Sequence, residues 1–230
     1  MIEVRHASKR RGRRELWHDL SFDVDRGEVV ALTGPSGAGK STLLDCLGHI
    51  DTLDAGSIHL DGMSAGHDPR RARLIRRRFL GYLFQDFGLV PDMTVQANID
   101  LARGQQRSTA QRGMPTSEAL ERVGLRGRAT DRAHELSGGE QQRVALARLL
   151  AKQPEVILAD EPTSALDGAN ASMVLDLLEE FAADGAAVVI ATHSAAVEAR
   201  AARTIALPGR LDCARPTPSG VRDEPGPLRP

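Results

Sequence analysis

The sequence predicts an α/β fold with a mainly parallel sheet, and three apolar runs carry this prediction. Val29–Thr33 leads into a glycine-rich turn, Val156–Ala159 precedes two carboxylates, and Ala187–Thr192 precedes a histidine. These runs are continuous rather than alternating, which is typical of parallel strands buried on both faces. Helical spacing of apolar residues lies between them, over Ser41–Leu47, Gly139–Lys152 and Ala169–Ala183. Alternating strands and helices indicate an α/β domain.

Two regions depart from this alternation. Strand-like pieces at Ile2–Val4, Leu20–Val24 and Ile58–Leu60 are broken by Gly and Asp, and they predict a small antiparallel β subdomain beside the main sheet. From Gly88 to Leu136 the composition becomes helical and polar, which predicts an inserted helical subdomain at about 88–150. Half of the 12 prolines fall in 208–230, so 1–207 is predicted to be the folded domain and 208–230 a disordered tail.

The composition excludes several classes of protein. The 30 Lys and Arg against 31 Asp and Glu leave a formal net charge of -1, so the chain as a whole is not drawn to nucleic acid or anionic lipid. Cys46 and Cys213 cannot form a disulfide scaffold, and no apolar run approaches the roughly 20 residues that cross a bilayer. Met1–Arg14 is too charged for a secretory signal. We therefore expect a soluble protein of a reducing compartment.

A phosphate-binding loop is the first functional motif. It comprises Gly34, Pro35, Ser36, Gly37, Ala38, Gly39, Lys40, Ser41 and Thr42. The pattern GxxxxGK[ST] stands between a predicted strand and a predicted helix, as it requires. Its glycines let backbone N–H groups turn toward a phosphate, Lys40 places a charge on the β and γ phosphates, and Ser41 offers a hydroxyl to Mg²⁺. The motif predicts a P-loop NTPase core but not its purpose, because kinases, GTPases, helicases and transport ATPases share it.

Asp160 and Glu161 follow an apolar strand at its C-terminal edge, where ligands bind in open α/β sheets. We expect Asp160 to hold Mg²⁺, directly or through water. Glu161 is expected to polarise the attacking water beyond the γ-phosphate. A solvated strand end would explain the pair if it stood alone, so these roles depend on the rest of the site.

The segment around Ser137 is the most discriminating. Ser137 and Glu140 satisfy the S-x-x-E capping box, which predicts that a helix begins there. Gly138 and Gly139 each cost a helix about 1 kcal/mol relative to Ala, and a cap does not need them. Their presence indicates that an anionic group approaches the backbone at this helix N-terminus.

With these motifs the chain resembles the ATP-binding subunit of an ATP-binding-cassette transporter. The matching segments occur in family order and span residues 34–193. They are Gly34–Thr42, Leu83–Gln85, Leu136–Glu140, Asp160–Pro162, Ser164–Asp167 and Ala191–His193. The amino-acid sequences of Gly81–Gln85 and Leu158–Thr163 are most similar to those of the family branch that serves lipoprotein release, macrolide export and bacteriocin export.

The resemblance implies a head-to-tail homodimer, or a pair of related subunits, in the ATP-bound state. Each ATP would lie between the phosphate loop of one chain and Ser137, Gly138 and Gly139 of the other. Asp167 would lie at the subunit boundary, and His193 would donate a hydrogen bond to the γ-phosphate. Gln85 would contact Mg²⁺ and the attacking water. Taken alone, His193 would be interpreted as an ordinary strand-end histidine and Gln85 as a surface amide.

One position departs from the family. Members usually carry an aromatic residue near the N-terminus that stacks on adenine, whereas Ser8–Arg14 contains none. Trp17 stands at an apolar strand position and is expected in the core. We hypothesise that an arginine, with Arg11 the best candidate, stacks on the base instead, or that base recognition is weak.

A basic cluster follows Asp68 and Pro69, which form a reasonable helix start. Its members are Arg70, Arg71, Arg73, Arg76, Arg77 and Arg78. A solvated helix face is the simpler interpretation. Contact with a membrane partner or with lipid headgroups is the alternative.

The function implied by the resemblance is that of an ATPase subunit, with ATP and Mg²⁺ as ligands, which powers a separate transmembrane permease. We expect it in the cytoplasm, peripheral on the inner face of the cell membrane, with no nucleic acid partner. Two alternatives stay open. The same ATP cycle could serve signalling or mechanical work on a membrane partner without transport. A DNA-acting relative would need a coiled coil or zinc insertion between Lys40 and Ser137, where fewer than 100 residues lie.

Overall fold

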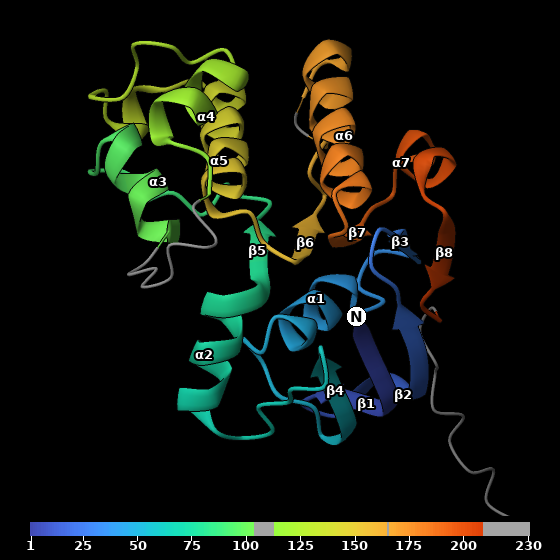
Figure 1. Cartoon of the computed structure of the whole chain (residues 1–230). Helices are drawn as coiled ribbons and strands as arrows, with labels where there is room; N and C mark the ends of the chain where they lie inside the picture. Colours follow the sequence, from blue (N-terminus) through green and yellow to red (C-terminus); the bar gives the residue numbers. More distant parts are fainter. Residues whose placement is uncertain (104–112, 165, 209–230) are drawn as a thin grey trace, which may run out of the picture.

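The computed structural model describes residues 1–103, 113–164 and 166–208, so all but Pro208 of the predicted tail lies outside the described residues. A five-stranded sheet forms the centre in the order β5-β6-β7-β3-β8, with every pairing parallel (Figure 1). The strands are β3 (Val29–Thr33), β5 (Leu80–Leu83), β6 (Val156–Asp160), β7 (Ala187–Ala191) and β8 (Arg203–Ala206). The predicted α/β class with a parallel sheet is confirmed.

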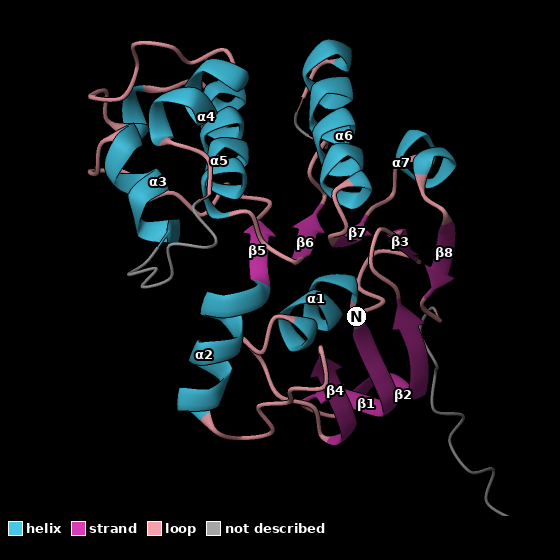
Figure 2. Cartoon of the chain, in the orientation of Figure 1, coloured by secondary structure: helices cyan, strands magenta, loops and turns pink. Residues whose placement is uncertain are grey.

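A second sheet is antiparallel and has the order β2-β1-β4 (Figure 2). Its strands are β1 (Ile2–Arg11), β2 (Arg14–Val24) and β4 (Ala55–Leu60), so the prediction of an antiparallel sheet is confirmed. The strands are longer than predicted. Register shifts interrupt the pairing, and His6 and Asp19 have positive φ there. Such bulges break the period-two pattern from which strands are recognised in a sequence.

The helices are α1 (Lys40–Leu47), α2 (Pro69–Phe79), α3 (Val95–Arg103), α4 (Thr116–Arg122), α5 (Gly138–Lys152), α6 (Gly168–Ala183) and α7 (Ala195–Arg200), with a 3-10 turn at Ala133–Glu135. The three helices predicted over Ser41–Leu47, Gly139–Lys152 and Ala169–Ala183 begin and end within one residue of α1, α5 and α6. The capping box of α5 is confirmed, because Ser137 Oγ accepts from the Glu140 N–H while the Glu140 carboxylate accepts from the Ser137 N–H. Asp68 caps α2 in the predicted way.

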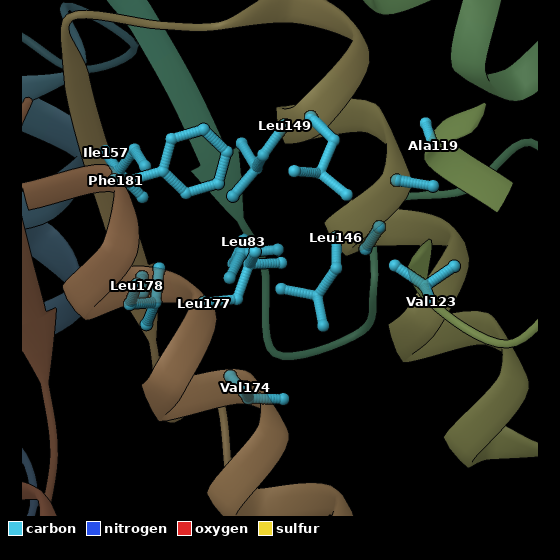
Figure 3. Close-up of a cluster of buried hydrophobic side chains, with 14 of the residues drawn as sticks. Leu83, Ala119, Val123, Leu146, Leu149, Ile157, Val174, Leu177, Leu178 and Phe181 are labelled. Carbon is cyan, nitrogen blue, oxygen red and sulfur yellow. The ribbon is translucent and has the colours of Figure 1, made fainter. Parts of the chain in front are cut away.

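The central sheet is covered on both faces, which explains its continuous apolar strands. Ile157 and Val188 belong to a core shared with α5 and α6, whereas Leu158 and Val189 belong to a core shared with α1 and the antiparallel sheet. Figure 3 shows the first core, in which Phe181 of α6 lies close to Leu149 of α5. Adjacent strand residues point to opposite faces, so both faces of these strands must be apolar.

Helices α3 and α4 pack on α5 (Figure 1). Between Gly88 and Leu136, a segment predicted as helical, many of the residues that the structure describes form loops. Asn98 holds part of this loop, because its buried side chain accepts from the Val90 N–H and donates to the Val90 and Thr94 carbonyls. Among the described residues, no helix has the length and apolarity needed to span a bilayer.

Candidate active site

The phosphate loop connects β3 to α1, and its glycines adopt conformations that other residues avoid. Gly37 has φ 75° and Gly39, the N-cap of α1, has φ 92°. Gly34 has φ 139°, and a Cβ on it would lie 2.8 Å from the Leu207 carbonyl oxygen. The backbone of the loop therefore requires glycine at these positions.

A pocket of about 650 Å³ lies above this loop. It is lined by Ser36, Gly37, Gly39, Lys40, Ser41 and Thr42, by Gln85, Asp160, Glu161 and His193, and by Arg11, Arg14, Leu16 and Ser164. The structure thus brings together every residue expected to be catalytic or to hold a metal. Gly34, Pro35 and Ala38 shape the loop without lining the pocket, and the Ala38 N–H donates to the Pro35 carbonyl at 3.0 Å.

Lys40 and His193 meet at the floor of the pocket. The buried Lys40 ammonium donates to Nε2 of His193 at 2.7 Å and to the Gly34 carbonyl at 2.9 Å. Burial lowers the pKa of Lys40, while the negative charges of Glu161 and Asp160 oppose this shift. An incoming phosphate would therefore compete with the Gly34 carbonyl and His193 for the Lys40 ammonium.

Glu161 is held in an unusual state. Its backbone has φ 46°, a left-handed conformation that is costly for a residue with a side chain. The Glu161 N–H donates to the Ala191 carbonyl, which fixes this residue against β7. Oε1 is buried without a hydrogen-bond partner and lies 3.6 Å from Nε2 of His193. A free, buried carboxylate oxygen in a cleft is available to accept a proton from water.

Oxygen donors suited to Mg²⁺ line the same pocket, namely the Ser41 hydroxyl, the Asp160 carboxylate and the Gln85 amide. Among the described residues no group of three or more His, Cys, Asp or Glu side chains could hold a metal ion. Mg²⁺ does not need such a group, since it is usually bound by one or two carboxylates together with substrate phosphates and water. The residues present therefore fit Mg²⁺ carried on a nucleotide.

The remaining predicted residues lie outside this pocket. Ser137 and Gly138 are exposed at the start of α5, Gly139 is partly exposed beside them, and Asp167 is exposed at the start of α6. None of these four lines the pocket.

A hydrogen-bonded chain connects these two helix starts. Nη1 of Arg143 donates to the Asn170 side chain at 3.0 Å, and Asp167 accepts from the Asn170 backbone and amide at 2.9 Å. These bonds from Asn170 lower the pKa of Asp167. The Glu140 carboxylate accepts from Ser137 and pairs with Arg128, which lowers its pKa to about 2. The starts of α5 and α6 are thus joined by hydrogen bonds into one polar surface.

Sequence reasoning missed three residues that line the pocket. Nη2 of Arg14 donates to the Gly37 carbonyl at 2.6 Å, and Leu16 packs where a Cβ of Gly39 would lie. Ser164 donates through Oγ to the Glu161 carbonyl at 3.0 Å. Of these three residues, only Ser164 could have been identified from the sequence, because it belongs to the family motif Ser164–Asp167. Arg11 lines the pocket, and Trp17 is only 1% exposed, so its predicted place in the core is confirmed.

The sequence of this chain is similar to those of known proteins. Residues 17–164 match the model of the ABC transporter family. The chain is 43% identical to the lipoprotein-releasing system ATP-binding protein LolD 2 of Rhodospirillum rubrum over 220 residues, which cover 92% of this chain and 95% of the relative. It is 42% identical to the macrolide export ATP-binding/permease protein MacB of Rhodopseudomonas palustris, covering 82% of this chain and 29% of that relative. The chain thus spans about a third of the length of the ATP-binding/permease relatives.

Solved structures agree with the sequence relatives. The structure superposes on the dimeric ATP-binding cassette MJ0796, in a post-hydrolysis state bound to ADP and Pi, with a TM-score of 0.81. The two share 33% identity over 90% of this chain and 94% of the other. Together with the phosphate loop, the free Glu161 carboxylate and the family match, this places the chain in the ABC transporter family as an ATP-binding cassette, an ATPase.

Proposed function

We propose that the chain is the ATP-hydrolysing subunit of an exporter, which dimerises head to tail around two MgATP molecules and drives a membrane permease. One observation carries this proposal. The phosphate loop and Glu161 share a pocket, whereas the exposed Ser137 and Gly138 at the start of α5 do not line it. A second copy of the chain can supply these residues to the open side of the pocket.

The residues divide the reaction between them. The loop N–H groups and Lys40 bind the β and γ phosphates, so Lys40 exchanges its bond to His193 for a phosphate oxygen. Glu161 holds and then accepts a proton from the attacking water through its free Oε1. His193, freed from Lys40, orients the γ-phosphate.

Ser41, Asp160 and Gln85 would hold Mg²⁺, which would neutralise negative charge on the phosphates when bound. Asp160 is the last residue of β6 and Ser41 lies in the first turn of α1, so each side chain reaches the pocket from an element of regular secondary structure. Gln85 follows β5 and is the one of the three on a loop. It is therefore the residue best placed to move with the nucleotide state.

The permease is proposed to dock in a cleft of about 280 Å³ that is lined by residues of α2, α3, α5 and β5. Ile50, Val90 and Leu101 line it, with 51%, 43% and 57% of each residue exposed. Lys152 lines it as well, and burial lowers the pKa of this lysine to about 8. An amphipathic segment with apolar side chains and a carboxylate fits such a surface.

Several relatives support export at a membrane. The relatives include macrolide and pyoverdine export proteins and a lipoprotein-releasing system. We infer from these names that this chain acts at the inner face of the cell membrane beside a permease.

The head-to-tail arrangement is tested by mixing two inactive variants, Lys40→Ala and Gly138→Asp. A Cβ on Gly138 would meet only Phe87, at 3.8 Å, so Asp fits the fold and acts only by repelling phosphate. If each site draws on both chains, a mixed dimer has one intact site, and the equal mixture regains up to about a quarter of wild-type ATPase activity. A mixture as inactive as its components would refute the proposal.

A further inference from the structure

Helix α2 carries a dense positive charge that the proposed ATPase function does not use. It has six arginines in 11 residues, no acidic residue, and three of the arginines in its last turn. Ala72, Ile75 and Phe79 are buried and hold the helix against the core. Arg70, Arg71 and Arg73 are therefore displayed on the solvent side, where all three are exposed.

Many arginines elsewhere on the protein form ion pairs with nearby carboxylates. Examples are the pairs Arg5–Asp23, Arg26–Glu155, Arg122–Glu180, Arg128–Glu140, Arg200–Glu179 and Arg203–Glu28. By contrast, Arg70, Arg71 and Arg73 form no ion pair with any residue in 1–103, 113–164 or 166–208. Their charge is available to an anion outside the chain.

An exposed apolar side chain stands within this charged face. Leu74 is 54% exposed and follows Arg70 and Arg71 by one helical turn. The nearby cleft, which Arg76 of α2 also lines, exposes Ile50 and Leu101. On a membrane surface, arginine side chains contact lipid headgroups and an apolar side chain enters the headgroup–acyl boundary, so this combination of residues suits such a surface.

We propose that the outer face of α2, formed by Arg70, Arg71, Arg73 and Leu74, binds anionic phospholipid headgroups. The proposal rests on the proposed function in one respect, since a permease in the neighbouring cleft brings the membrane to this side of the protein. A lipid surface matches this face better than nucleic acid does, because lipid accommodates the exposed Leu74 as well as the charges. Each arginine near an anionic surface strengthens binding about five-fold.

The test measures sedimentation of the full chain with vesicles of phosphatidylcholine alone or mixed equally with phosphatidylglycerol. We expect the wild type to bind the anionic vesicles only. The triple variant Arg70→Gln/Arg71→Gln/Arg73→Gln should bind them about 100-fold more weakly. The matched control Arg5→Gln/Arg122→Gln/Arg126→Gln removes the same charge from ion-paired positions, of which Arg5 is half-buried and the other two are exposed, and should bind like the wild type.

Equal binding to both vesicle types, or equal loss in the two triple variants, would overturn the proposal. Binding of the same proteins to duplex DNA is measured as well. If the Arg70/Arg71/Arg73 triple variant lost binding to DNA but kept its binding to vesicles, the proposal would also be overturned. ATP binding is followed in parallel through the fluorescence of Trp17, the single tryptophan, which packs against Gly39. Absence of ATP binding in the wild type would count against the proposed function and leave the vesicle result interpretable.

Discussion

The ammonium of Lys40 lies 2.7 Å from Nε2 of His193, although 153 positions separate the two residues in the sequence. Lysine can only donate, so Nε2 accepts and the neutral ring carries its proton on Nδ1. A phosphate oxygen is a stronger acceptor than imidazole. Nucleotide binding is thus expected to draw Lys40 away and leave Nε2 free. His193 must then take the other tautomer, or a second proton, before it can donate to a γ-phosphate.

Replacing Glu161 by Gln tests the assignment of the base. The amide keeps the shape of the side chain but cannot accept a proton, so we expect ATP binding to persist while hydrolysis falls at least about 100-fold. With the γ-phosphate retained, the ATP-bound dimer should become stable. Trp17 fluorescence, phosphate release and size-exclusion chromatography measure these three properties.

Glu198→Gln is the matched control, because Glu198 is exposed on α7 and does not line the pocket. This variant should hydrolyse ATP at the wild-type rate. Undiminished turnover in Glu161→Gln would remove Glu161 from its role.

Gly34 is expected to be intolerant of any side chain. In Gly34→Ala the new methyl group would lie 2.8 Å from the Leu207 carbonyl oxygen, on a backbone with φ 139°. We expect the free energy of unfolding in urea to drop by about 2 kcal/mol or more. Gly168→Ala, at the first position of α6 with open space around it, should change stability by less than about 1 kcal/mol and in the stabilising direction. Equal effects would contradict the assigned close approach.

The phosphate loop and the start of α5 were predictable because their signals are local. The glycine-lysine pattern and the capping box each lie within ten residues. Each structure is therefore determined by residues that are close together in the sequence. Strand β5 was not predicted, because it is determined by tertiary contacts rather than by a local sequence pattern. It has only four residues, and one is Gly81, where a Cβ would lie 2.5 Å from Leu149 and 2.7 Å from Pro154. Strand β8 was missed because Arg203 and Thr204 give an edge strand no apolar run.

The part played by Arg14 could not be read from the sequence either. It depends on the register that pairs Arg11 with Arg14 at the end of the β1–β2 hairpin. That register brings both arginines over the phosphate loop, although Gly37 is 23 positions away in sequence. Contacts of this kind are fixed by bulges and turns, whose positions the residue pattern did not reveal.

His49 should make the stability of the protein depend on pH. Burial, then the charges of Arg76 and His59, lower its pKa to about 4. Between this value and the unfolded pKa of about 6.5 the unfolded chain binds more protons, so stability is fully present above pH 6.5 and is lost as pH falls toward 4. Asn tolerates the positive φ at this position. Between pH 7.5 and pH 5 we therefore expect the free energy of unfolding in urea to fall by about 2 kcal/mol less in His49→Asn than in the wild type. Parallel losses would show that His49 is protonated equally in both states.

Arg11 distinguishes base stacking from weak base recognition. It lines the pocket with Arg14 and Leu16, whereas Glu161 and His193 belong to the phosphate end of the bound nucleotide. If its guanidinium stacks on adenine, Arg11→Ala should weaken binding of ATP about five- to ten-fold but hardly change binding of inorganic triphosphate, and Arg11→Tyr should restore ATP affinity. Arg13→Ala, outside the pocket, is the control. Equal weakening of both ligands would assign Arg11 to the phosphates, and no change in either would leave recognition of the base weak.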